Sequence, residues 1–278
     1  MAGIFLRFPG GKAKALTLSY DDGVEQDIRL IEIMNRHSLK GTFNLNSGLY
    51  APEGTVYPKG QVHRRMTKKQ VTEVYGHAGQ EIAVHSLTHP FLEQLPVPLA
   101  VGEVMRDREN LEEQFGTIVR GMAYPYGTFS DSLVEALKSC GIAYARTTVS
   151  TNQFKIPADW LRLHPTCHHK SPELKSLAQK FVEDSVTQAP YLFYLWGHSY
   201  EFEGDGNWSV IEDFAEYTGN REDIWYAANI EIYDYIAAYN RLLFSADGKR
   251  VRNPSHTALW FACADQIIEL AAGEEKVL

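Results

Sequence analysis

Short apolar runs alternate with longer amphipathic stretches along most of this chain. The apolar runs have the length of buried strands, and the longer stretches repeat apolar residues at helical spacing. Strands are predicted at residues 15–20, 42–46, 81–86, 142–147, 160–164, 191–196 and 224–227, with a further short apolar segment at 121–126. Helices are predicted at residues 24–37, 67–75, 99–115, 131–139 and 231–239, and another begins at Ser171-Pro172-Glu173 with Ser171 as its cap. This alternation predicts parallel βαβ units.

Seven or eight such units in 278 residues predict an α/β fold of the (β/α) barrel type, for which about 250 residues is typical. A doubly wound open sheet is the alternative. The pattern changes near residue 240, where a hairpin around Asp247-Gly248 and strands at 256–263 and 266–270 are predicted. We therefore expect one domain over residues 1–278, with residues 240–278 as a β-rich C-terminal appendage.

Composition narrows the function classes. The formal net charge is -8, which argues against nucleic-acid and anionic-membrane partners. No apolar run is long enough to predict a transmembrane helix. Cys140, Cys167 and Cys263 form no C-x-x-C pair, and residues 1–14 lack a signal-peptide pattern. We expect a cytoplasmic protein without disulfides, and an oligomer of the chain with itself is left open.

Three segments place chemically active residues at the ends of predicted strands. Asp21 and Asp22 precede Gly23, so one carboxylate could bind a metal while the other stays free as a base; the same pattern is common in polar turns. His85 and His89 are four residues apart, and on a helical turn two imidazoles at this spacing can hold one divalent metal. Asp22, His85 and His89 would make a set of three ligands, which is typical of a catalytic metal site.

The third segment brings a histidine out of the strongest predicted strand. His198 follows Trp196-Gly197, where a barrel would present it at its active rim. An imidazole with an ordinary pKa near 6.5 suits general acid catalysis.

These segments together resemble the polysaccharide deacetylase family, the proteins with a NodB-like domain. The motifs appear in family order over about residues 15–235: Tyr20-Asp21-Asp22-Gly23, His85-Ser86-Leu87-Thr88-His89, Ala123-Tyr124-Pro125-Tyr126 and Leu195-Trp196-Gly197-His198. The resemblance implies a distorted (β/α) barrel with seven or so parallel strands.

The resemblance also implies roles for single residues. Asp22, His85 and His89 would bind one divalent metal, commonly zinc, with cobalt, nickel or manganese as alternatives. Asp21 would be the catalytic base and His198 the catalytic acid, and the backbone N–H of Tyr126 would help to hold the oxyanion.

The chain departs from the family in its third motif, where the usual arginine is Ala123. Arg146, near the end of the next predicted strand, or Arg162 could replace the missing cation. The family's Asp-Trp element is matched only weakly by Asp159-Trp160, so the partner of His198 stays open.

Other residues are candidates for substrate contacts. Trp196, beside His198, is the strongest aromatic candidate for a cleft, and Asn229 could reach the rim after the strand at 224–227. His164 belongs to a cluster, residues 163–169, that could line the cleft or hold a second metal. The substrate-binding candidates are Tyr124, Pro125, Trp196, Arg146 and His164.

The pattern as a whole predicts a metal-dependent hydrolase that removes the acetyl group from an N-acetylated sugar. A carbon–nitrogen hydrolase of a small cyclic amide or ureide is the second hypothesis. A non-catalytic sugar-binding barrel is the third, and the missing arginine is the feature in its favour. A glycosidase fits less well, because adjacent carboxylates cannot flank a glycosidic bond at the required separation.

Overall fold

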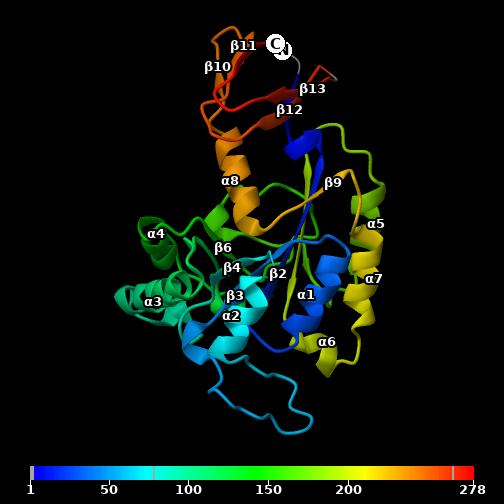
Figure 1. The fold of residues 1–278 in the computed structure, drawn as a ribbon. Coiled ribbons are helices and arrows are strands. Elements are labelled where there is room, and N and C mark those ends of the chain that lie inside the picture. The colour runs from blue at the N-terminus through cyan, green and yellow to red at the C-terminus, as the bar shows by residue number, and fades with distance from the viewer. Residues whose placement is uncertain (1–2, 78, 265) are drawn as a thin grey trace.

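The computed structural model of the chain describes residues 3–77, 79–264 and 266–278. Its centre is a curled sheet of parallel strands surrounded by helices (Figure 1). In chain order the strands of this sheet are β2 (Lys14–Asp21), β3 (Gly41–Leu45), β4 (Glu81–Val84), β5 (Gly121–Ala123), β6 (Tyr144–Arg146), β7 (Cys167–His168), β8 (Tyr191–Gly197) and β9 (Ile224–Tyr226). The helices are α1 (Asp27–Arg36), α2 (Lys68–Gly76), α3 (Val97–Phe115), α4 (Asp131–Ser139), α5 (Leu174–Glu183), α6 (Tyr200–Gly204), α7 (Ser209–Thr218) and α8 (Asn229–Tyr239).

The strand order makes this sheet a distorted (β/α) barrel. Strands β2 to β6 lie side by side in chain order, and β2 also pairs with the late strand β8. The remaining gap is bridged by the segment from Leu163 to His168. Leu163 pairs with Arg146 of β6, while Cys167 and His168 pair with β8. The barrel prediction is therefore confirmed, in preference to a doubly wound open sheet.

Alternation along β8 explains how the barrel is packed. Tyr194 and Trp196 point inward and form a small cluster with Tyr144 and Leu163. Phe193 points outward and packs on Phe181 of α5 and Phe214 of α7. A strand that is buried on both faces reads as a continuous apolar run, which is why residues 191–196 give the strongest strand signal.

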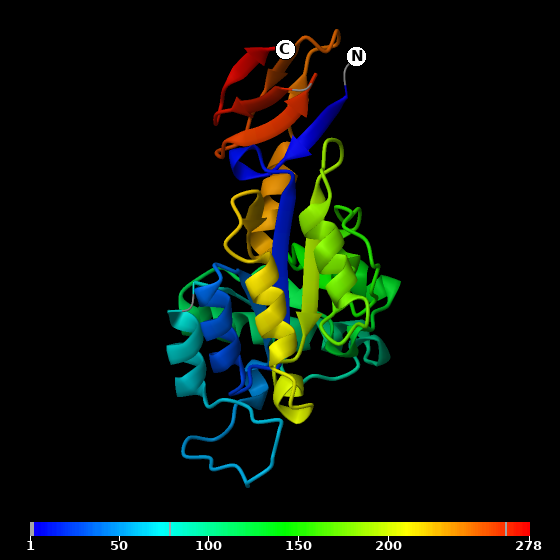
Figure 2. The ribbon, with the colours of Figure 1, turned by 90° about the vertical axis from the view of Figure 1, so that its right-hand side faces the viewer.

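The C-terminal strands form two small antiparallel sheets at one end of the barrel (Figures 1 and 2). One sheet joins β1 (Ile4–Arg7), β12 (Leu259–Cys263) and β13 (Gln266–Leu270); the other joins β10 (Leu243–Phe244), β11 (Arg250–Arg252) and β14 (Glu275–Val277). The predicted hairpin around Asp247-Gly248 is present as the β10–β11 pair. The predicted β-rich appendage is thus confirmed, and it also recruits the N-terminal strand β1.

Two local predictions are wrong. Residues 160–162 form a short 3-10 helix and not a strand, because Asp159 caps this turn by accepting a hydrogen bond from the Leu161 N–H. Helix α5 begins three residues later than Ser171, with Glu173 as its N-cap. Ser171 is bonded instead to the Glu173 backbone and carboxylate.

No helix in the described part of the chain combines the length and the hydropathy that a membrane crossing requires.

Candidate metal and catalytic site

The candidate site lies at the carboxyl ends of the parallel strands, at the end of the barrel away from the C-terminal sheets (Figure 2). Asp21 is the last residue of β2, and Asp22 and Gly23 follow with φ angles of 84° and 65°. Backbone in this left-handed region is easy for glycine and costs a non-glycine residue energy. The sharp turn sends the two adjacent carboxylates to different partners.

Asp21 is buried among cations and donors. Its Oδ1 accepts a hydrogen bond of 2.8 Å from the Asn44 amide, and its Oδ2 is bonded by the Arg146 guanidinium. The Nε2 atoms of His85 and His198 each lie 3.8 Å from the same Oδ2. Burial alone would raise the pKa of Asp21, but Arg146, His85 and His198 together hold that pKa below its ordinary value. Asp21 is therefore an ionised carboxylate in a water-poor site.

Asp22 is held by two residues of the long loop before α2. Arg65 donates to Asp22 Oδ1 at 3.0 Å, and His63 Nε2 lies 3.3 Å from Oδ2. Burial favours the neutral acid, but the His63 hydrogen bond, the nearby His85 ring and the charge of Arg65 keep the pKa of Asp22 well below its usual range. The short-range sequence pattern gives no sign of His63 or Arg65, because they come from a loop without periodicity.

His85 and His89 come together, although not on a helical turn. They lie in a loop after β4, in which Ser86 and His89 have φ angles of 63° and 56°. The two Nε2 atoms are 3.1 Å apart. The expected helical geometry is thus wrong, while the expected proximity is present.

The partners of His85 fix which of its nitrogens is free. Its Nδ1 lies 2.9 Å from the Ala123 carbonyl oxygen, which can only accept, so the proton is on Nδ1 and the Nε2 lone pair faces the site. Its backbone N–H is bonded by the buried Asp107 of α3 at 3.0 Å. Burial lowers the pKa of His85 to about 4, so the ring is neutral at physiological pH.

The residues present fit a divalent metal ion. Asp22, His85 and His89 offer one ligand atom each, and these atoms all lie within 4.8 Å of one another. Two neutral imidazoles and a carboxylate are the donors that zinc and similar ions accept, and three protein ligands leave coordination positions open.

Arg146, and not Arg162, supplies the cation next to Asp21. Its side chain is buried, bonds Asp21 and lies with its guanidinium carbon 4.4 Å from the centre of the Trp196 ring. Arg162 forms ion pairs with Asp131 and Asp159 on the outside of the barrel. Asp159 is engaged there and does not face His198.

Glu201, in the short helix α6, is the partner of His198. Its Oε2 lies 3.4 Å from His198 Nδ1 and 3.2 Å from the Nε2 atoms of both His168 and His169. Lys170 Nζ lies 3.2 Å from the other oxygen, Oε1. We call Glu201, His168, His169, Lys170 and His198 the Glu201 cluster. The sequence could have indicated the contact between His198 and Glu201, because these residues are only three positions apart. It could not have indicated their contact with His168 and His169, which lie about thirty residues earlier.

The residues of the Glu201 cluster shift one another's pKa values in opposite directions. Burial opposes ionisation of Glu201, but its three histidine neighbours hold its pKa far below the ordinary value. Burial also opposes protonation of His198, yet Glu201, Asp21 and Asp22 raise the pKa of His198 above its ordinary value. For the more deeply buried His169, burial dominates and lowers the pKa to about 4.

The hydrogen bonds of His168 argue against a second metal in this cluster. Ligand atoms of His168, His198 and Glu201 also lie within 4.8 Å of one another. However, the Lys170 backbone N–H donates to His168 Nδ1 at 3.1 Å, which puts the ring proton on Nε2, the atom that faces Glu201. A protonated nitrogen has no lone pair for a metal.

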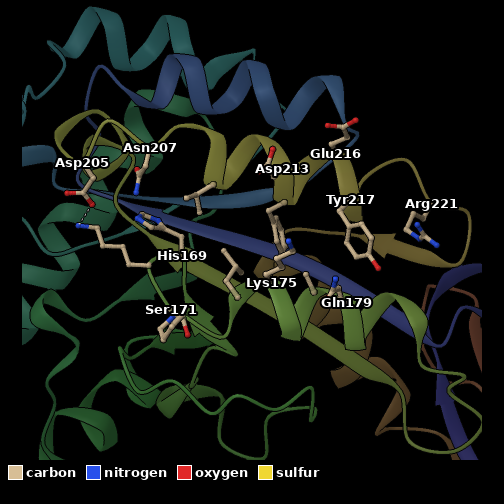
Figure 3. A pocket seen from close by; sticks show the side chains of 16 residues that line it. His169, Ser171, Lys175, Gln179, Asp205, Asn207, Asp213, Glu216, Tyr217 and Arg221 are labelled. Carbon is tan, nitrogen blue, oxygen red and sulfur yellow. Dashed lines mark ion pairs between the residues drawn. The ribbon is translucent and has the colours of Figure 1, made fainter.

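His169 also reaches one end of a groove of about 920 Å³ between α5 and α7, where Lys170 pairs with Asp205 (Figure 3).

The remaining candidates are spread over several environments. Tyr126 has a φ angle of 58°, is half exposed, and lies edge-to-face against His89. Tyr124 and Pro125 are buried, and the Tyr124 hydroxyl donates to the Leu161 carbonyl. Trp196 lies between Arg146 and His168.

Two candidates lie away from the metal ligands. His164 is exposed, with Nδ1 2.6 Å from the Thr147 hydroxyl. Asn229 does not reach the rim: β9 pairs only with the first half of β2, so Asn229 is buried inside the barrel against Thr17 and Tyr194.

Comparisons with solved structures find two with a similar fold and a third that matches about half of this chain. A Mycobacterium smegmatis protein whose assignment as a polysaccharide deacetylase is provisional is 16% identical, with a TM-score of 0.58 over 86% of this chain and 96% of that one. A family 4 carbohydrate esterase from Streptomyces lividans, solved with acetate, is 14% identical, with a TM-score of 0.50 over 77% and 92%. A Streptococcus pyogenes deacetylase, also solved with acetate, is 21% identical with a TM-score of 0.43; the match covers 52% of this chain and 62% of that one.

No curated protein matches this chain. At the identities above, the solved structures show likeness of fold alone. The family model named polysaccharide deacetylase matches residues 9–145, the part that contains Asp21, Asp22, His85 and His89. By this match, which covers just under half of the chain, residues 9–145 are similar to the polysaccharide deacetylase family.

Proposed function

We propose that this protein hydrolyses the N-acetyl group of an N-acetylated sugar with the help of one divalent metal ion. The observation that carries the proposal is the position of Asp21. This ionised carboxylate lies next to the candidate ligand His85 on one side and His198 on the other, and Arg146 orients it. A base, an acid and a set of metal ligands thus meet at one edge of the barrel.

Each residue then has a distinct task in amide hydrolysis. Asp22, His85 and His89 would hold the metal, which would lower the pKa of a water molecule and polarise the amide carbonyl. Asp21 takes the proton of the attacking water, and its oxygen is kept in place by Asn44 and Arg146.

Proton donation and charge stabilisation complete the scheme. His198 donates its Nε2 proton to the departing amine, which would otherwise be a poor leaving group. Asp21 Oδ2 and His198 Nε2 are 3.8 Å apart, so the proton taken from water would return to the histidine through a bridging water between turnovers. The backbone N–H of Tyr126 is a donor for the developing oxyanion.

An exposed aromatic pair beside the ligands supports a sugar as the substrate. Phe91 is stacked on Tyr126 with ring centres 3.8 Å apart, and Tyr126 in turn contacts His89. The two rings are 40% and 51% exposed, so both present aromatic surface to solvent beside the ligands. Aromatic faces of this kind can pack on the apolar face of a sugar ring.

Replacing Phe91 tests this surface. We expect Phe91→Ala to raise KM for N-acetylated oligosaccharides by about two- to tenfold, with a smaller change for the monosaccharide, because a lost stacking contact is worth roughly 0.5–1.5 kcal/mol. Steady-state kinetics on sugars of increasing length measure the effect. Val56→Ala is a control, since Val56 is exposed in the loop before α2 and has no place in the scheme. Equal KM values for wild type and Phe91→Ala on every sugar would contradict the assignment of this surface.

The pH dependence of acetate release tests the acid and the base. Asp21 acts when ionised and its pKa is lowered, so the acidic limb attributable to Asp21 should lie below about pH 4. His198 acts when protonated and its pKa is raised, so the basic limb should lie above about pH 6.5. A value of kcat/KM that stays constant from pH 5 to pH 9 would count against His198 as the acid.

Acetate release from N-acetylglucosamine oligomers by the zinc-loaded protein is the direct test of function. Release that disappears in Asp21→Asn supports the proposal. Turnover of a cyclic amide or ureide, with none of the acetylated sugars, would replace it by the second hypothesis. Binding of the oligomers without any turnover, at full metal content, would identify a sugar-binding barrel.

A further inference from the structure

We propose that Glu201 is the positioning residue of the candidate acid: it fixes the ring orientation of His198 and the nitrogen that carries its proton. Its consequence for catalysis rests on the proposed function, but the contact itself can be tested without any turnover. In this chain the residue comes from the helix directly after His198, and the Asp159 that the sequence suggested is bonded elsewhere.

One oxygen of Glu201 reaches both the backbone and the ring of His198. Glu201 Oε2 lies 3.4 Å from the His198 backbone nitrogen and 3.4 Å from its Nδ1. The neighbouring residue is also anchored, because the Ser199 hydroxyl donates to the buried carboxyl group of Asp27 at 2.5 Å. The loop that carries His198 therefore has little freedom to turn the imidazole away from Asp21.

The rest of the Glu201 cluster holds the carboxylate in place. Lys170 lies 3.2 Å from Oε1, while His168 and His169 each lie 3.2 Å from Oε2. His169 is itself packed against Gly197, where a Cβ atom would come within 2.0 Å of its Nδ1. The glycine before His198 thus makes room for a side chain that contacts Glu201.

The direction of the hydrogen bond decides which nitrogen can do chemistry. An ionised carboxylate only accepts, so the bond to Glu201 keeps a proton on His198 Nδ1. The proton that can be given away is then on Nε2, the atom that faces Asp21. The other neutral tautomer would set the Nδ1 lone pair against the Glu201 carboxylate, with no hydrogen bond between them.

Several charged and titratable groups surround His198, so the effect of Glu201 must be separated from theirs. They are Asp21 and Asp22 at the end of β2, His168 and His169 of the β7 segment, and Tyr200 and Glu201 of α6. Among these, Glu201 is the carboxylate bonded to Nδ1, whereas Asp21 faces Nε2. A substitution of Glu201 should therefore remove the acceptor of the Nδ1 hydrogen bond and leave Asp21 beside Nε2.

The test compares Glu201→Gln and Glu201→Ala with Glu203→Gln. Glu203 is a matched control on the same helix, where it pairs with Arg64 and Gln26 and takes no part in the cluster. The full-length zinc-loaded protein is labelled with ¹⁵N in its histidines, and the His198 signals are assigned by their loss in His198→Gln. Chemical shifts followed against pH give both the tautomer and the pKa of His198.

We expect Glu201→Gln to lower the pKa of His198 by about one pH unit, because it removes a neighbouring negative charge. Glu201→Ala should in addition mix the two tautomers, and Glu203→Gln should change neither property. Where deacetylation is measurable, the basic limb of kcat/KM should move to lower pH by the same amount in Glu201→Gln. Glu201→Asp, which keeps the charge with a shorter reach, should recover part of the wild-type value.

An unchanged His198 tautomer and pKa in both Glu201→Gln and Glu201→Ala would overturn the inference, whether or not the protein is active. Failure of the proposed function gives a different result: no acetate release in wild type, with the shifts of His198 still dependent on Glu201. If Glu201→Ala does not fold, Glu201→Gln and Glu201→Asp decide the question, since Gln keeps the volume of the side chain and Asp keeps its charge.

Discussion

Replacing Arg146 with methionine should lower kcat by about 100-fold, the scale of a lost general base, while the metal content stays unchanged. Arg146 bonds the Asp21 carboxylate and touches none of the three candidate ligands among the contacts described. Without it, Asp21 loses both its orientation and the main force that keeps it ionised. Methionine retains an apolar stem against Trp196, so the change isolates the charge.

The same substitution should destabilise the fold at neutral pH. Removing one partner of a buried ion pair costs about 3–5 kcal/mol, because the other charge is left uncompensated. Arg146 and Asp21 are both almost fully buried, so solvent screening would reduce this cost very little. Thermal or urea unfolding measures the loss.

The size of this loss should depend on pH in a defined direction. In wild type the pKa of Asp21 is lower in the folded than in the unfolded chain, so its ionisation stabilises the fold above about pH 4 and the contribution is lost as pH falls. In Arg146→Met the strongest neighbouring charge is gone, so burial should outweigh the remaining histidines and raise the pKa of Asp21 above its unfolded value. The ionised form then opposes folding at neutral pH. The gap in unfolding free energy between the two proteins should therefore narrow toward pH 4.

Arg162→Met is the matched control. Arg162 is the other arginine that the sequence offered, but its ion pairs with Asp131 and Asp159 are exposed at the surface. Such pairs contribute about 0–1 kcal/mol, so stability and turnover should stay close to wild type. Full activity in Arg146→Met, or an equal loss in Arg162→Met, would show that Arg146 is not the replacement for the cation missing at Ala123.

The sequence predicted those features that are set by residues next to one another in the chain. The capping residue Thr67 and the left-handed Gly116 mark where α2 begins and α3 ends, and both do so in the structure. Strand β8 was readable from its apolar run because it is buried on both faces. The segment at 160–164 has the same composition as a strand, but Asp159 caps a turn there, and a single capping contact outweighs propensity.

In the candidate site, too, the residues in short motifs could be predicted and the residues from distant segments could not. Adjacent carboxylates and paired histidines are visible as short motifs, and the structure does bring Asp22, His85 and His89 together. The groups that hold them come from distant segments: Asn44 and Arg65 support the two carboxylates, and Asp107 anchors the His85 backbone. No spacing rule in one sequence connects such residues, because their proximity is created by strand order and loop conformation. Glu201 is the intermediate case, near His198 in sequence but identified only by its contacts.

Measuring the metal content should show which group of residues binds the metal: Asp22, His85 and His89, or the Glu201 cluster. We expect about one divalent metal ion per chain in wild type after incubation with zinc, as measured by mass spectrometry of the purified protein. His85→Ala should lose it, because removing a direct ligand should weaken binding by more than about 100-fold, the upper range for loss of an indirect one. His168→Ala, from the Glu201 cluster, and His256→Ala, exposed near the C-terminal sheets, should both keep it.

Thermal stability gives a second readout of the same binding. A ligand that binds only the folded state stabilises it by about 2.7 kcal/mol when present at 100 times its Kd. Zinc added to protein stripped with a chelator should therefore raise Tm in wild type and in His168→Ala, but not in His85→Ala. Because His85 is neutral down to a pH of about 4, the rise in Tm should persist in mildly acidic buffer. Metal lost from His168→Ala and kept by His85→Ala would move the site to the Glu201 cluster. Absence of metal from every protein, after zinc, cobalt, nickel and manganese have each been tried, would remove the hydrolase mechanism and leave a barrel that binds sugars without acting on them.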